Sequence, residues 1–130
     1  MNKPIIKKED GRLKSICNEA FYGVKSFLPS FIRESEKYDK ALAYIFGGVA
    51  GHEVAHLGEY LINLANTYGA DLPLEKIVSH CLAATIATPI VSYLIAPKYV
   101  NNFIRENPTY SSGTAGVMSG AVIKALEILS

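Results

Sequence analysis

Residues 77–96 form a run of 20 residues that contains no Asp, Glu, Lys or Arg. As a helix with a rise of about 1.5 Å per residue, the run is about 30 Å long, which matches the hydrocarbon core of a bilayer. Pro89 lies inside the run and predicts a kink of the kind that membrane helices tolerate, and Pro97 ends it. The run therefore has to cross a membrane or lie against other apolar helices.

Two further long helices are expected on either side of this run. Helical periodicity with few charges predicts one helix over 39–68, with Gly69 as its stop, a second over about 72–96, and a last helix from 113 to about 129. A short amphipathic piece at 98–107 joins the second helix to the last. We therefore predict an all-α fold in which residues 41–130 form one apolar three-helix domain.

Residues 1–40 differ from the rest because they carry nine Lys and Arg and six Asp and Glu. Residues 1–11 are expected to be a solvated tail, and 33–40 a charged connector. Between them, apolar residues recur with a helical period from Leu13 until Pro29 ends the helix. This amphipathic helix either lies in a membrane interface or covers a soluble core.

The charges that flank the three long helices favour a membrane protein. Taken as spans, they leave a charge of +3 on the N-terminal arm, −1 on the 65–76 loop and +1 on the 98–108 loop. The two positive segments thus lie on one side of the membrane and the negative loop lies on the other. This charge difference places the N-terminus in the cytoplasm. Glu53 and Glu59 argue against this, because an ionised residue at mid-bilayer costs about 2.5–3.5 kcal/mol. We predict a small polytopic membrane helical bundle, with a soluble four- to five-helix bundle as the alternative.

Length, net charge and cysteine content exclude several other classes of protein. A chain of 130 residues suits one compact domain, and a net charge of +1 gives no overall field for nucleic acid. Cys17 and Cys81 make neither a disulfide framework nor a metal motif, so they are expected to be small core residues, with Cys17 on the reducing, intracellular side. The Lys-rich N-terminus shows no apolar stretch typical of a secretory signal.

The helix at 39–68 carries a polar stripe that could form a site. His52, His56 and Glu59 fall on one face, because they are spaced by three or four residues. Together with Glu53, the two histidines also match the short pattern of zinc-dependent hydrolases, in which the histidines bind the metal and the glutamate activates a water. This chain has no Gly-x-x-His after His56 and no aspartate after Asp71, so neither of two usual third ligands is present.

A third partner is expected from the next helix. If residues 41–96 form a hairpin that turns near 70–71, His80 lies within about one turn of Glu59. Helical bundles hold metals between facing helices in this way. We therefore predict a cluster of four side chains that can bind one divalent metal (zinc or iron) or relay protons, namely His52, His56, Glu59 and His80.

Small residues recur at intervals of three or four in two of the expected helices. One stripe contains Gly47, Gly51 and Gly58, and the other contains Ser112, Gly116 and Gly120. This spacing lets helix backbones approach closely, either within the chain or in a homo- or hetero-oligomer.

Three functions remain open from the sequence. The first is a small integral membrane protein, in contact with the lipid bilayer, whose His/Glu cluster binds a metal or relays protons. The second is a zinc metallopeptidase with Glu53 as the base. The third is a structural subunit of a membrane assembly that docks through the glycine stripes.

Overall fold

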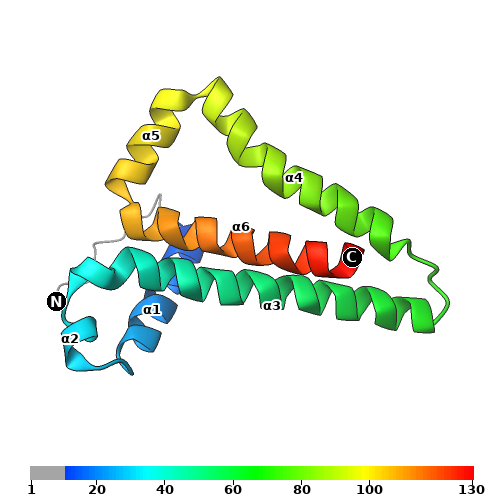
Figure 1. The fold of residues 1–130 in the computed structure, drawn as a ribbon, viewed down its shortest axis with the longest axis horizontal. Helices are drawn as coiled ribbons and strands as arrows, with labels where there is room; N and C mark the ends of the chain where they lie inside the picture. Colours follow the sequence, from blue (N-terminus) through cyan, green and yellow to red (C-terminus); the bar gives the residue numbers. More distant parts are fainter. Residues whose placement is uncertain (1–10) are drawn as a thin grey trace.

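The computed structural model describes residues 11–130, and within this range the chain is helical with no strand. Figure 1 shows the helices in chain order. The predicted all-α class is therefore confirmed. Of the tail expected at 1–11, residues 1–10 lie outside the described range, and Gly11 begins the first helix. The elements are α1 (Gly11–Lys25), α2 (Ser30–Arg33), the 3-10 helix η2 (Glu36–Tyr38), α3 (Asp39–Thr67), α4 (Leu74–Ile95), α5 (Pro97–Glu106) and α6 (Pro108–Leu129).

The long helices begin and end close to where the sequence signals place them. Gly69 adopts a φ of 93° just after α3, a left-handed conformation that glycine reaches without strain. The Asn66 side chain then ties the loop, because it accepts a hydrogen bond from the Leu72 N–H at 2.5 Å and donates one to the Leu72 carbonyl at 3.0 Å. Only α6 differs clearly from expectation. It begins at Pro108 rather than Gly113, because proline suits the first turn of a helix.

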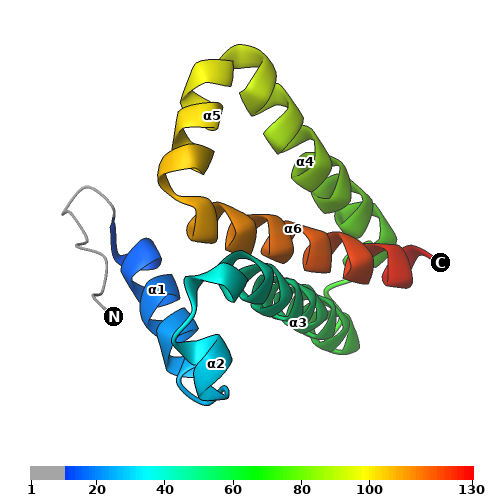
Figure 2. The same cartoon turned by 60° about the vertical axis from the view of Figure 1, so that its left-hand side comes forward.

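Helices α3 and α6 form the most extensive contact in the described chain, and they run side by side in the same direction (Figures 1 and 2). Their backbones touch at four glycines. A Cβ atom added to any of them would come closer than 3.0 Å to backbone atoms of the other helix. These residues are Gly47 and Gly51 on α3, and Gly116 and Gly120 on α6. No side chain larger than hydrogen fits at this contact.

Hydrogen bonds fix the register of the pair. The Ser112 hydroxyl donates to the Lys40 carbonyl at 2.6 Å, and the Tyr44 hydroxyl donates to Ser119 Oγ at 2.9 Å. Gly58 takes no part in the helix contact, since a Cβ there would meet nothing within 4 Å.

Helix α4 leaves the α3–α6 pair instead of packing along it. Its half-buried residues lie in its first half, whereas every residue from 86 to 95 is exposed. Helices α4, α5 and α6 consequently outline a triangle (Figure 1). The expected hairpin of 41–96 is therefore wrong as a packing unit, because α3 and α4 touch only slightly and α6 takes the place next to α3.

The N-terminal arm is attached to the first turn of α3 by a buried ion pair. The Lys25 ammonium contacts the Asp39 carboxylate and also donates to the Ser35 carbonyl at 3.4 Å. Lys25 is only 1% exposed. The ring of Phe21 packs edge-on against Phe46, with centroids 6.4 Å apart. Burial, together with the nearby Asp39 carboxylate, raises the pKa of Tyr22.

The described helices bury little apolar surface against one another. Among the side chains that the structure describes, the buried apolar residues are Ala43 and Ala125 alone, whereas many large apolar side chains are exposed, among them Phe27 (89%) and Ile95 (78%). Cys17 and Cys81 are also exposed and free, so their expected place in a core is wrong. By length and composition, α4 is the one helix within the described residues that is apolar enough to cross a membrane on its own.

Candidate functional site

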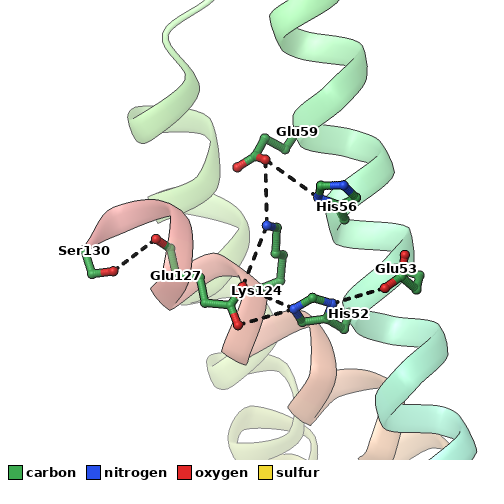
Figure 3. A network of polar contacts seen from close by, with 7 residues as sticks. All are labelled: His52, Glu53, His56, Glu59, Lys124, Glu127 and Ser130. Atoms are coloured by element: carbon green, nitrogen blue, oxygen red, sulfur yellow. Dashed lines mark hydrogen bonds and ion pairs between the residues drawn. The ribbon is translucent and has the colours of Figure 1, made fainter.

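Titratable side chains from the middle of α3 and the end of α6 meet on the C-terminal side of the glycine contact (Figure 3). Residues 52, 56 and 59 share one face of α3, because their spacing matches a helical turn. Residues 124 and 127 are likewise one turn apart on α6. The α3–α6 network, as we call it, consists of His52, Glu53, His56, Glu59, Lys124 and Glu127.

The imidazole of His52 bridges carboxylates from both helices. Its Nε2 lies 3.2 Å and 3.4 Å from the two carboxylate oxygens of Glu127 on α6. Its Nδ1 lies 3.5 Å from Glu53 Oε1 on α3. The contact to Glu127 is within hydrogen-bonding distance, so a proton can be shared between the helices at this point.

Lys124 joins this bridge to the rest of the network. Its Nζ lies 3.7 Å from Glu127 Oε2 and 3.7 Å from Glu59 Oε1. His56 Nδ1 lies 3.8 Å from the same Glu59 oxygen. The network is therefore a continuous chain of charges that runs Glu53, His52, Glu127, Lys124, Glu59, His56.

The charges of the network balance only when it takes up additional positive charge. Three carboxylates face one ammonium, so the network carries −2 when both imidazoles are neutral and is neutral when both are protonated. The side chain of Lys124 is 13% exposed and that of Glu59 is 21% exposed. Unbalanced charge is costly where burial limits contact with water, and within the network this applies to the Lys124–Glu59 pair.

A groove of about 340 Å³ runs along the same pair of helices and reaches the network. Its lining includes Tyr44, Gly48, His52, Glu53, Ser119 and Ile123. The side chain of Glu53 is 66% exposed. His52, whose side chain is 32% exposed, is therefore accessible from outside the pair.

The structure brings three of the four predicted cluster residues into the network but leaves His80 out. His80 is exposed on α4, and its Nδ1 lies 2.7 Å from the Lys76 carbonyl of its own helix. Within residues 11–130, no group of three or more His, Cys, Asp or Glu side chains is arranged to hold a metal ion. The predicted metal set of His52, His56, Glu59 and His80 is thus not assembled, because α6 rather than α4 lies along α3.

Lys124 and Glu127 are the network residues that the sequence argument missed. They interrupt the apolar run of the last helix, and they follow Gly120 of its small-residue stripe by about one turn (Lys124) and two turns (Glu127). Packing the two small stripes against each other in parallel would have placed them beside His52 and Glu59. The signal was therefore present, but it required the correct pairing of helices.

No protein-family model matches this chain, and neither curated proteins nor solved structures gave a match.

Proposed function

We propose that this protein is a small polytopic membrane protein in which α3, α4 and α6 span the bilayer, and that the α3–α6 network holds and exchanges protons within it. The exposed apolar surface supports the membrane placement, because isolated soluble domains do not leave so many large apolar side chains in water. Close glycine contacts are typical of helix pairs in membranes. The parallel direction of α3 and α6 also fits three consecutive spans (Figure 2).

The distribution of positive charge supports a cytoplasmic N-terminus. Helices α1, α2 and α5 lie at the end of the molecule where α3 and α6 begin (Figure 2). Lys and Arg are concentrated at this end, on the arm and at Lys98 and Arg105, whereas the opposite loop of 68–73 carries Asp71 alone. This asymmetry follows the positive-inside tendency.

The observation that carries the proton function is the His52 imidazole, which lies between a carboxylate of α3 and one of α6. Imidazole gains and loses a proton near neutral pH, and ionisable groups inside a membrane are usually functional. The other links of the network, at 3.5–3.8 Å, are longer than hydrogen bonds. Transfer along them requires a side-chain rotation or a bridging water.

The other two hypotheses gain less support from this geometry. A divalent metal would supply the same two positive charges, but His52 and His56 contact different carboxylates and would have to turn toward one point. The metallopeptidase hypothesis needs such a metal. The assembly hypothesis needs stripe glycines that are free to contact a partner. Four of the five predicted stripe glycines already contact the other helix of this chain, and only Gly58 has no neighbour within 4 Å of an added Cβ.

Proton uptake by liposomes tests the proposal. The protein is reconstituted with a pH-sensitive dye inside the vesicles, and a potassium gradient with valinomycin drives protons inward. We expect wild type and His80→Gln, a matched change of a histidine outside the network, to acidify the lumen, and His52→Gln to lose most of this flux. Equal fluxes in the two variants, or no flux in wild type, would overturn the proton function.

Metal analysis of the same preparations decides between protons and a metal. Mass spectrometry is applied to wild type and His56→Ala purified in mild detergent. Near-stoichiometric zinc or iron that disappears in the variant would replace the proton function by a metal site. If neither wild type nor His56→Ala contains bound metal, the proton flux measured in liposomes decides the proposal by itself.

A further inference from the structure

We propose that α5 lies in the lipid–water interface on the cytoplasmic side, with its apolar face toward the acyl chains and its polar face toward headgroups and water. This inference rests on the proposed membrane placement and extends it to a fourth element. The partner surface is the lipid bilayer itself.

The two faces of α5 differ more sharply than those of any other long helix in the described range. At about 100° per residue, the apolar residues fall on one side of the helix and the polar residues on the other. The apolar side contains Tyr99, Val100, Phe103 and Ile104, and the polar side contains Lys98, Asn101, Asn102 and Arg105.

The protein covers only part of this apolar face. Phe103 and Val100 are half-buried, and the Phe103 ring packs edge-on against Tyr110 of α6 with centroids 5.9 Å apart. Tyr99, however, is 72% exposed and Ile104 is 49% exposed. In water this uncovered apolar surface would be unfavourable, whereas a lipid interface would cover it.

The position of α5 in the chain sets its depth. The helix joins the end of α4 to the start of α6 (Figure 1), and prolines begin both α5 and α6. If α4 and α6 span the bilayer, their connected ends lie at one membrane surface, so α5 lies there too. Tyrosine, lysine and arginine are residue types that favour this depth.

The chain contains no tryptophan, so one introduced tryptophan reports its own depth without background. Three variants are compared in vesicles: Tyr99→Trp on the apolar face of α5, Asn101→Trp on its polar face, and Ile86→Trp near the middle of α4. Each is quenched by lipids brominated near the headgroup, by lipids brominated near the chain end, and by aqueous iodide.

We expect a different dominant quencher for each position. Tyr99→Trp should respond most to lipid brominated near the headgroup, Asn101→Trp severalfold more than Tyr99→Trp to iodide, and Ile86→Trp most to lipid brominated near the chain end. Circular dichroism of each variant checks that the fold is retained. Comparing Tyr99→Trp with Asn101→Trp shows whether one face of α5 is turned toward lipid or whether the whole helix lies equally close to lipid.

The outcomes separate this inference from the proposed function. If Ile86→Trp is deep but the two α5 variants respond alike, the interfacial orientation of α5 is wrong and the membrane placement stands. If Ile86→Trp responds mainly to iodide, the membrane placement fails and this inference fails with it.

Discussion

Helices α3 and α4 are neighbours in sequence and both are long and apolar, yet only α3 acquires a tightly packed partner. The α3–α6 pair meets through glycines and lets the two backbones touch. Helix α4 carries larger aliphatic side chains and no glycine, and its second half is exposed. In apolar surroundings, burying apolar surface gives little driving force for association, so close approach and polar contacts decide which helices pair.

The largest effect should come from filling the glycine contact. Gly120→Leu places a side chain where even a Cβ would overlap the Gly48 carbonyl. We expect it to separate α3 from α6 and to lower the free energy of unfolding by about 3 kcal/mol or more. Unfolding in mixed micelles of mild detergent and dodecyl sulfate, followed by circular dichroism, measures the loss. Gly58→Leu is the matched control, and an equal loss there would contradict the contact.

A smaller loss is expected from Lys124→Met. This change removes the ammonium that lies between Glu59 and Glu127 and leaves two carboxylates without their shared partner. We expect a loss of up to about 1 kcal/mol at neutral pH, because Glu127 is 52% exposed and keeps contact with water. The loss should shrink as the pH falls, because protonation removes the charge of both carboxylates. Lys76→Met, in the first turn of α4 and outside the network, provides the control. A loss of stability in Lys124→Met that does not depend on pH would argue against an electrostatic role.

A single methyl group should act with opposite signs at two glycines of the same helix. At Gly51 an added Cβ overlaps the Val117 backbone, so Gly51→Ala should destabilise the protein. At Gly58 the same change meets nothing and should stabilise α3 by up to about 1 kcal/mol, because alanine is the better helix former. The pair is compared by the same micelle unfolding. Shifts of the same sign would refute the difference between the two positions.

The smallest effect should come from α4. Leu94 is 74% exposed, so Leu94→Ala removes a large side chain that packs against little of the protein. We expect its unfolding free energy to stay within about 0.5 kcal/mol of wild type. A loss as large as that of Gly51→Ala would show that the end of α4 packs against something in the folded protein.

The helices could be predicted well from the sequence because their signals are local. Helix boundaries are marked by Gly69, by Pro97 and by the run at 77–96 that has no charged residue. The structure places these boundaries within a few residues of expectation. The α3 half of the network could be predicted equally well, because the spacing of His52, His56 and Glu59 alone places them on one face.

The α6 half of the network could not be predicted in the same way. It depends on which helix lies beside α3, and sequence adjacency suggested α4 and therefore His80. The actual choice depends on contacts between residues 75 positions apart, such as Tyr44 with Ser119. Those contacts are specified by backbone fit at the glycines, which no periodicity on a single helix reveals.

The parallel pairing of α3 with α6 also has a consequence for biosynthesis. The hydrogen bonds across the pair join residues that are 72–75 positions apart, so α3 is complete long before its partner exists. At about 5–20 residues per second, the ribosome needs roughly 4–15 s to make the intervening chain. During this interval Glu59 lacks Lys124, and if α3 spans the bilayer as proposed, it has to wait at the insertion machinery or at the membrane surface. Under the proposed membrane placement, entry of α3 into the bilayer and synthesis of α6 are thus coupled in time.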